Sequence, residues 1–517
     1  MEFFNFDGDV LSRLASLFVF DASSPMTLTS GLFLFVFLIF GAGYLLVRRH
    51  ITLRTLYVVL FSLYFYYKLS GLYLLLLLFV GVSDFMIGRR VAQCLDNSRS
   101  ARGWVALSVV INVAILAYFT ATNFFVDTIN GIYGEGTLDV AKVVKPAGVS
   151  FFVFQSLAYV IDISRGSIKP LRRFRDYLFL LAFFPKVLCG PLVRAKDFIQ
   201  QMQSPTLPLS REDLGRAVKL IAAGLLKFSV IATVLGQLFV RPAFAGELGD
   251  GGLVALLAVY GFTLQIYCDF SGISDIAVGV ALLMGFHLPD NFDAPYKSAT
   301  ITEFWRRWHI SLSSWLRDYL YISLGGNRKG RFRTYLNLFL TMFLGGLWHG
   351  VSLCYVAWGM LHGIALALHK VWLKVVPNAK SVGEQMRPFV RVPATILTFH
   401  IVAFGWLLFA SAQMFPDEDI AVAGDIMSRI ANNFSFAEFA PLVDSCAAPL
   451  ALMALGYILH LLPRRMDRAT VGVVTRSGFV GQWLVIVVMI WLVMQTAMLL
   501  AADVGVGGGG LPMYGAY

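Results

Sequence analysis

Two histidines, His309 and His349, lie in a charged, aromatic and glycine-rich stretch inside an otherwise apolar chain. His309 follows Trp308 and two arginines, whereas His349 ends an apolar run. A neutral imidazole can accept a proton from a hydroxyl group near neutral pH. Desolvation favours that neutral form in an apolar run, which keeps the lone pair of His349 available. His349 is therefore a candidate general base, with a purely structural buried histidine as the alternative.

Glycines flank His349 on both sides. Gly345 and Gly346 precede Trp348, and Gly350 follows the histidine. A glycine lets another backbone or a ligand approach closely because it has no Cβ. The spacing therefore favours a long, narrow substrate that reaches the imidazole beside Trp348.

Composition places this chain of 517 residues in the membrane. It is 58% hydrophobic and only 14% charged, and its mean hydropathy is +0.71. The core of one soluble domain could not bury so many apolar side chains. A bilayer core needs about 20 apolar residues per helix, and by that criterion the chain holds roughly eleven spans. The run 147–163 contains Gln155 and Asp162, which predicts a re-entrant or tilted piece. We expect an all-α polytopic membrane protein.

The apolar runs also suggest a division of the chain. Residues 1–28 form an N-terminal interfacial segment, because acidic residues precede any apolar run and a signal peptide begins with basic ones. A core then covers 29–411 and includes a catalytic region at 302–369. The rest comprises an extramembranous loop at 412–446 and C-terminal transmembrane helices with a tail at 447–517.

Basic clusters recur after every second apolar run, at Arg48, Arg89 and Arg172. Residues 127–140 instead carry acidic side chains and no Lys or Arg. The positive-inside rule then puts the basic turns in the cytoplasm and the loop around Gly134 outside. Orientation and anionic lipid headgroups account for the net charge of +11, so nucleic acid is not indicated as a partner.

Ionisable residues within apolar runs cost free energy when they are placed in a membrane, so their presence indicates a role. Asp269 and Asp275 share one run but lie roughly 120° apart on a helix, so they do not form a carboxylate dyad. Bonding to a neighbouring helix is the favoured interpretation, and direct catalysis is the alternative. The five cysteines are scattered without metal-ligand spacing, which predicts no metal site and no disulfide framework.

Cationic side chains gather around and after His309. They could form a vestibule for a phosphate-bearing donor, or anchor the segment at the membrane surface. The sequence GGNRKG lacks the spacing of a P-loop, so ATP and GTP are not indicated. The candidate donor-binding residues are Arg306, Arg307, Arg317, Arg328 and Lys329.

Several motifs together resemble the membrane-bound O-acyltransferase superfamily. They begin with ITEFWRRWHISLSSWLRDYLYISLGGNRKG at 301–330, followed by NLFLTMFLGGLWHG and WGMLHG. Within the superfamily the chain is similar to the bacterial branch of alginate O-acetyltransferases, over most of residues 30–410. Further matching segments are GVSFFVFQSLAYVIDISRG at 148–166, FFPKVLCGPLVRAKDF at 183–198 and YCDFSGISDIAVGVALLMGFHLPDNFDAPYKS at 267–298.

This resemblance implies a curved helix bundle around a central funnel. His349 is then catalytic, as base or transient nucleophile, and His309 is a second catalytic residue near the cytoplasmic donor entrance. Acetyl-CoA is the implied donor substrate, and no cofactor is bound permanently. The expected residues lining the funnel are Trp305, Trp308, Trp348, Asp269, Asp275 and Gln155.

The resemblance also implies a process that crosses the bacterial inner membrane. Acetyl groups would pass from the cytoplasm to an exported polysaccharide, with alginate as the leading acceptor. A periplasmic acetyltransferase of the serine (SGNH) type is the expected partner, since this chain has no GxSxG element. The alternatives are O-acylation of cellulose, peptidoglycan or teichoic acid, the last by D-alanyl transfer. A transporter of lipids or acyl groups is the alternative from another class, although no internal repeat supports it.

Overall fold

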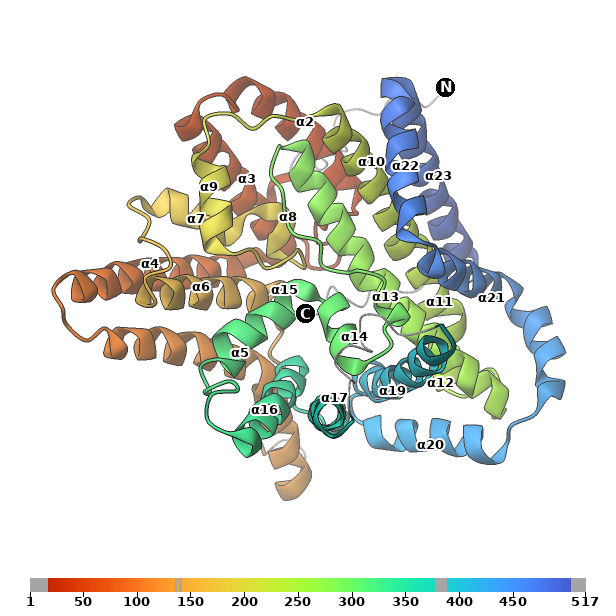
Figure 1. The fold of residues 1–517 in the computed structure, drawn as a ribbon. Coiled ribbons are helices and arrows are strands. Elements are labelled where there is room, and N and C mark those ends of the chain that lie inside the picture. Colours follow the sequence, from red (N-terminus) through yellow and green to blue (C-terminus); the bar gives the residue numbers. More distant parts are fainter. Residues whose placement is uncertain (1–16, 135–136, 139–141, 377–387, 504–517) are drawn as a thin grey trace.

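The structure is a computed structural model that describes residues 17–134, 137–138, 142–376 and 388–503. All regular structure in these residues is helical (Figure 1), so the prediction of an all-α protein is confirmed. The interfacial segment predicted at 1–28 lies largely outside the described residues.

The first half of the chain forms helices of very different lengths. In chain order they are α2 (Gly31–Val47), α3 (Ile51–Ser70), η1 (Gly71–Tyr73), α4 (Leu74–Asp96), α5 (Arg102–Tyr133), α6 (Val149–Ser164), α7 (Phe174–Ala182), α8 (Phe184–Val187), α9 (Ala195–Gln203), α10 (Arg211–Leu225), η2 (Leu226–Ala232), α11 (Thr233–Leu235), η3 (Gly236–Val240), α12 (Arg241–Phe244) and α13 (Gly252–Leu283).

The second half contains the segment with the two histidines and the C-terminal helices. In chain order the elements are η4 (Pro295–Lys297), α14 (Ile301–Arg307), α15 (Ile310–Trp315), η5 (Leu316–Tyr321), α16 (Arg331–His349), α17 (Leu353–Val375), α19 (Pro388–Met414), α20 (Asp419–Asn432), η6 (Phe436–Glu438), α21 (Phe439–Leu461), α22 (Arg464–Arg476) and α23 (Gly478–Asp503).

Among the described residues, eight helical stretches are long and apolar enough to cross a bilayer. The first of them, Ile51–Asp96, runs through both α3 and α4. Two shorter apolar helices, α2 and α6, correspond to runs that the sequence-based count of about eleven includes. Long apolar helices in this number confirm a multi-pass membrane protein.

Helix α6 forms most of the apolar run 147–163, which contains the polar residues Gln155 and Asp162. At 1.5 Å per residue its 16 residues extend about 24 Å, which is short for a bilayer core of about 30 Å. Its side chains are buried on nearly every side, Gln155 included. Protein rather than lipid therefore surrounds α6, and a protein interior can satisfy polar groups that lipid cannot.

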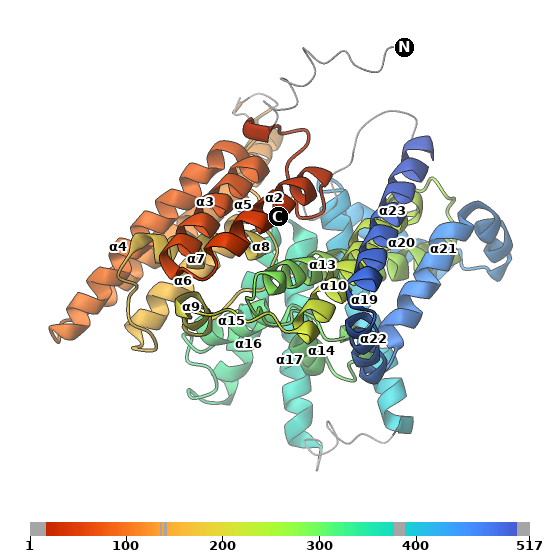
Figure 2. The ribbon, with the colours of Figure 1, turned by 90° about the horizontal axis from the view of Figure 1, so that it is seen from above.

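Helix α13 is the central element of the fold. It has 32 residues and is buried along almost its whole length. Figures 1 and 2 show the N-terminal helices, red to yellow, on one side of α13 and the blue C-terminal helices on the other. The segment that carries both histidines, α14 to α17, follows α13 in the chain, so α13 is the support against which this segment is placed.

A buried carboxyl group ties three N-terminal helices together. Asp84 on α4 accepts hydrogen bonds from Ser108 at 2.7 Å, Asn112 at 2.7 Å and Ser156 at 2.6 Å. These partners lie on α5 and α6, and all four side chains are fully buried. A buried carboxyl group needs such partners because none is available from lipid.

The segment predicted as an extramembranous loop, 412–446, contains helix α20 and the start of α21, which begins at Phe439. Helix α20 packs against α13, α17 and α19. The hydroxyl of Ser352, at the start of α17, donates to Asp419 of α20 at 2.5 Å. This segment therefore supports the turn between α16 and α17.

Candidate active site

The hairpin of α16 and α17 positions His349, the last residue of α16. The two helices approach each other through glycines. A Cβ added to Gly346 would lie 2.5 Å from the carbonyl oxygen of Tyr355, and one on Gly359 would lie 2.7 Å from the carbonyl oxygen of Met342. Gly346 thus serves the contact between two helices, whereas the sequence had suggested the approach of a substrate.

Aromatic side chains from three helices surround the imidazole of His349. The ring centroid lies 4.5 Å from that of Trp348, 4.9 Å from Phe409 and 5.4 Å from Trp358. Tyr355 is stacked at 5.9 Å. Because the side chain is only half-buried, a reacting group can reach an imidazole that is otherwise walled by apolar rings.

His309 lies in the turn between α14 and α15, with φ of 41° in the left-handed region. A non-glycine residue held there costs on the order of 1–3 kcal/mol, and such strain is concentrated at functional sites. The side chain is 4% exposed. Its ring meets Phe270 edge-on at 4.5 Å and lies nearly parallel to Phe151 and Phe292, both at 6.3 Å.

Electrostatics and packing connect the two histidines. His309 and Lys145 are both close enough to His349 to interact with it electrostatically. Helix α6 also joins them, because its Phe151 contacts His309 and its Phe154 lies 5.4 Å from Trp348. Lys145 precedes α6 and was not singled out from the sequence, since nothing local distinguishes a lysine between two apolar runs.

The candidate tryptophans have different surroundings. Trp348 contacts the ring of His349 directly. Trp305 donates from its indole nitrogen to Nδ1 of the fully buried His362 at 3.3 Å. Trp308 is 4% exposed and packs on Trp406 at 4.7 Å. Trp348 is therefore a wall of the site, while Trp305 and Trp308 make up the aromatic packing behind it.

The candidate polar residues also differ in their surroundings. Asp275 forms an ion pair with Lys227 of η2, which donates in addition to Ser271 at 3.1 Å. Asp269 lies on the same helix, α13, and is 3% exposed. Gln155 accepts a long hydrogen bond from Lys186 at 3.5 Å. Asp275 thus bonds to a neighbouring helix, which is the interpretation that the sequence favoured.

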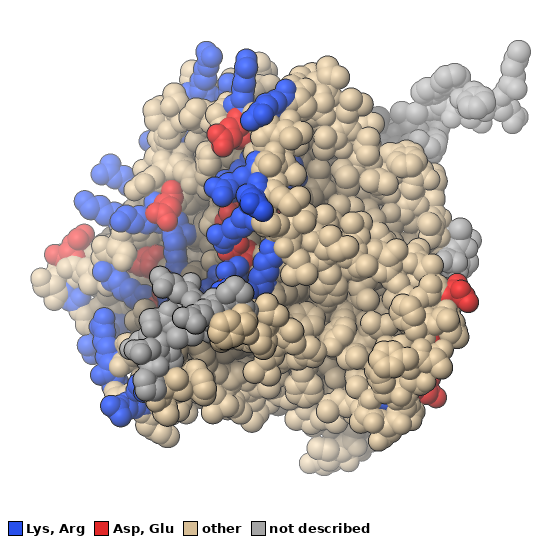
Figure 3. All heavy atoms as spheres, turned by 45° about the vertical axis from the view of Figure 1, so that its right-hand side comes forward, with Lys and Arg blue, Asp and Glu red and all other residues tan. Residues whose placement is uncertain are grey.

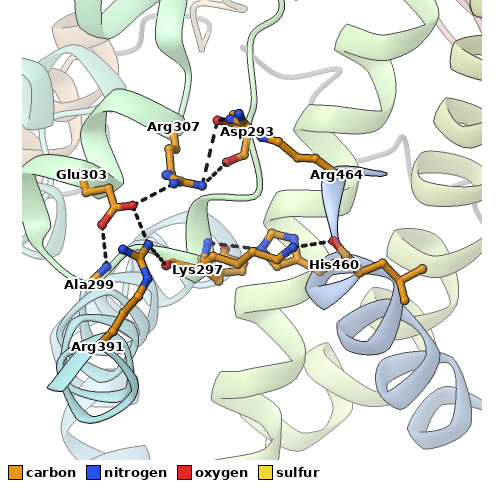
Figure 4. Close-up of polar contacts among 10 residues, drawn as sticks. Asp293, Lys297, Ala299, Glu303, Arg307, Arg391, His460 and Arg464 are labelled. Atoms are coloured by element: carbon orange, nitrogen blue, oxygen red, sulfur yellow. Dashed lines mark hydrogen bonds and ion pairs between the residues drawn. The ribbon is translucent and has the colours of Figure 1, made fainter. Parts of the chain in front are cut away.

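Arg307 takes part in a network of ion pairs, shown in Figure 4. It donates to Glu303 at 2.8 Å and to the backbone oxygen of Asp293 at 3.3 Å. Arg391 of α19 donates to the same oxygen of Glu303 at 3.0 Å. Arg464 of α22 donates to Asp293. This network holds the segment before α14 in place, so Arg307 is occupied within the protein.

The other candidate donor-binding residues are exposed. Arg317 donates to its neighbour Asp318 at 2.7 Å. Arg306, Arg328 and Lys329 form no ion pair with any described residue. Figure 3 shows Lys and Arg side chains gathered along one side of the molecule, while most of the remaining visible surface carries no charge.

A basic pocket of about 490 Å³ opens among the loop after α6, the start of α7 and α9. It is lined by four cationic side chains and one carboxylate. The sequence marks three of the cations as a cytoplasmic cluster, but the fold is needed to add the fourth from α9. These cations are Lys169, Arg172, Arg173 and Lys196.

Within the described ranges, His, Cys, Asp and Glu side chains form no group of three or more placed to hold an ion. The five cysteines are free thiols. Acid–base and nucleophilic chemistry at the two imidazoles is what the described side chains offer.

Long apolar helices that pack around two largely apolar-walled histidines define a multi-pass membrane protein. The model of the membrane-bound O-acyltransferase (MBOAT) family matches residues 172–411, which include both histidines. "Probable alginate O-acetylase AlgI" of Pseudomonas syringae pv. tomato is 39% identical over 423 residues, 80% of this chain and 76% of that protein.

Relatives named for other acceptors are also similar. "Peptidoglycan O-acetyltransferase" of Helicobacter pylori is 31% identical over 412 residues, 74% of this chain and 76% of that protein. "Teichoic acid D-alanyltransferase" of Streptococcus thermophilus is 32% identical over 283 residues, 51% and 68% of the two chains. The chain belongs to the membrane-bound O-acyltransferase family and is an acyltransferase, as its motifs predicted.

Proposed function

We propose that this protein is the membrane subunit of an O-acetylation system for alginate. It takes acetyl groups from cytoplasmic acetyl-CoA and passes them across the inner membrane to the exported polysaccharide. The observation that carries this proposal is the 39% identity, over about three quarters of both chains, to proteins named as alginate O-acetylases. The similarity to the peptidoglycan enzyme is lower, at 31%.

The chemistry follows from the surroundings of His349. Its neutral imidazole takes the proton of an acceptor hydroxyl while the oxygen attacks the thioester carbonyl of the donor. The carbon–sulfur bond breaks, coenzyme A leaves as a thiolate, and the proton passes from the imidazolium to that sulfur. The acceptor hydroxyl belongs to the polysaccharide or to a serine of a periplasmic acetyltransferase, which carries the acetyl group onward.

Cations on one side of the molecule support binding of the donor's phosphates. The basic turn at Arg48 lies beside the end of α9, because Arg54 donates to the carbonyl oxygens of Arg48 and Met202, at 3.2 and 2.8 Å. Arg165 donates to Asp318 at 3.0 Å, which joins the end of α6 to η5. Lys and Arg bind phosphate through charge-assisted hydrogen bonds. We assign the nucleotide of acetyl-CoA to this side, near the basic pocket and Lys329.

The cationic side of the molecule also predicts how the protein is oriented in the membrane. Arg48, Arg89, Arg172 and Lys329 are expected in the cytoplasm, and Gly134 at the end of α5 in the periplasm. A single cysteine at position 134, in a variant without native cysteines, should react with an impermeant thiol reagent on intact spheroplasts. A cysteine at position 329 should react only after lysis. Labelling of position 329 without lysis would contradict the proposed route of the acetyl group.

Deletion of the gene in its own organism tests the acceptor. We expect secreted alginate to lose its acetyl esters, measured by proton NMR, and to regain them with the parent gene but not with the His349→Ala variant. Unchanged alginate together with a loss of acetyl esters from peptidoglycan would replace alginate by the second candidate, which the similarity to the Helicobacter pylori enzyme supports. Transport of a labelled acyl compound without ester formation would favour a transporter.

A further inference from the structure

A short loop before α14 lies antiparallel to the turn that carries His309. The backbone oxygen of Asn291 accepts from the N–H of Ile310 at 2.9 Å, and the N–H of Asp293 donates to the oxygen of Arg307 at 3.0 Å. At Asp293 the loop is also held by Arg307 and Arg464 (Figure 4). The side chain of Asn291, 3% exposed, is thereby fixed beside His309.

One oxygen atom of Asn291 accepts three hydrogen bonds. The donors are the backbone N–H of Ser311 at 3.2 Å and its hydroxyl at 2.9 Å. The third contact is with Nδ1 of His309 at 3.1 Å. A backbone N–H can only donate, so the amide atom that faces it is the oxygen and not the nitrogen. The orientation of this amide is therefore determined by the main chain of Ser311.

The orientation of the amide determines the protonation of the imidazole. An amide oxygen only accepts, so Nδ1 of His309 carries the hydrogen in the neutral ring, and Nε2 carries the lone pair. Nε2 forms no hydrogen bond to any residue that the structure describes. The ring faces are covered by Phe151, Phe270 and Phe292, so the lone pair is the polar feature that His309 offers to its surroundings.

We propose that Asn291 is a positioning residue that keeps His309 neutral, as the tautomer with hydrogen on Nδ1. The lone pair on Nε2 then stabilises the positive charge that forms on His349 when it takes the proton of the acceptor hydroxyl. The second statement rests on the proposed function, while the first does not. Lys145 and His309 are the titratable groups that interact electrostatically with His349, so a protonated His309 would repel the imidazolium that forms at His349.

The choice of an amide rather than a carboxylate is central to this proposal. A carboxylate at position 291 would also accept from Nδ1, but its charge would favour a protonated His309. An uncharged acceptor fixes the tautomer without that bias. The Asn291→Asp and Asn291→Leu variants therefore separate two effects: the former keeps the hydrogen bond but adds charge, and the latter removes the hydrogen bond.

The tautomer can be observed without any enzyme activity. We expect solid-state ¹⁵N NMR of histidine-labelled protein in liposomes near pH 8 to show, for His309, a protonated Nδ1 and an unprotonated Nε2. The signal is assigned by its absence from the His309→Gln variant. A protonated Nε2 in the neutral ring would overturn the assignment of Asn291, whatever reaction the protein catalyses.

Kinetics of the same variants test the role in catalysis. Asn291→Leu should lower kcat by at least about 10²-fold at every pH, since a catalytic histidine held in the wrong tautomer can lower kcat by about 10⁴-fold. Its KM for acetyl-CoA should stay within about twofold. In the Asn291→Asp variant, kcat should be lower at neutral pH and should recover at higher pH. The acidic limb of the pH profile of kcat should therefore shift to higher pH. Asn432→Leu is the matched control, because Asn432 is an exposed amide on α20 whose side chain bonds only to Ser428 among the described residues, and it should retain kcat within about threefold.

The outcomes distinguish this proposal from its alternatives. If the parent protein transfers no acetyl group although a functional acceptor is present, the proposed function is refuted. The NMR result would still decide the tautomer of His309. A folded Asn291→Leu variant with parent kcat would overturn the catalytic role of Asn291. Equal losses in the leucine and aspartate variants, with no change in the pH profile, would assign Asn291 to structure alone.

Discussion

The His349→Ala variant should transfer acetyl groups at least about 10²-fold more slowly than the parent, because removal of a general base usually costs 10²- to 10⁴-fold in rate. The side chain is the last of its helix and only half-buried, so its loss leaves the hairpin of α16 and α17 in place. The rate is measured with radiolabelled acetyl-CoA on purified protein in liposomes.

Two further variants complete this experiment. His349→Gln retains the bulk of the side chain but cannot act as a base at neutral pH, and it should be equally slow. His400→Ala is the control, because His400 is exposed and, among the described residues, bonds only to Tyr260 and to its own helix. It should react at nearly the parent rate. A monodisperse, thermally stable His349→Ala protein with full activity would show that His349 is not catalytic.

Gly346→Ala should be the most damaging single-methyl change in this region. The added Cβ would lie 2.5 Å from the oxygen of Tyr355, and both that atom and the neighbouring atoms of Gly359 belong to the backbone. A backbone cannot rotate away, so the two helices must separate. Overpacking of this kind costs about 1–3 kcal/mol of stability, and a displacement of about 1 Å can reduce the rate by about 10²-fold.

The adjacent glycine supplies a matched control. A Cβ on Gly345 would meet no atom within 4 Å, and alanine favours a helix over glycine by about 1 kcal/mol. Gly345→Ala should therefore keep full activity and melt at the same or a higher temperature. Both variants are compared by acetyl transfer and by thermal unfolding in detergent. Equal behaviour of the two would contradict the helix contact assigned to Gly346.

The polytopic all-α fold and the family could be predicted from the sequence because each leaves a local pattern. Apolar runs long enough for a bilayer mark the helices, and histidines are conspicuous in such surroundings. Motifs around His309 and His349 identified the family. Partners across the fold leave no such pattern. Nothing near Asp275 in the chain indicates that Lys227 neutralises it.

The same reasoning explains which contacts of the candidate site could not be predicted from the sequence. Asn291 stands in a motif that was recognised, yet its contact with His309 depends on a loop that folds back beside the turn. Gly346 was read as room for a substrate, because a sequence cannot show whether a ligand or a helix occupies the space beside a glycine. Arg307 was predicted to bind the donor, but it pairs with Glu303 of its own helix and with Asp293 of the preceding loop.

The ion pair between Arg464 and Asp293 has a consequence for protein engineering. Arg464 lies beyond residues 172–411, the range that the family shares, while Asp293 lies within it and two residues from Asn291. The shared core is thus not a portable module. A chimaera that exchanges the core between relatives with different acceptors, but keeps the C-terminal helices of one parent, must carry both partners of this pair together if the loop beside His309 is to keep its shape.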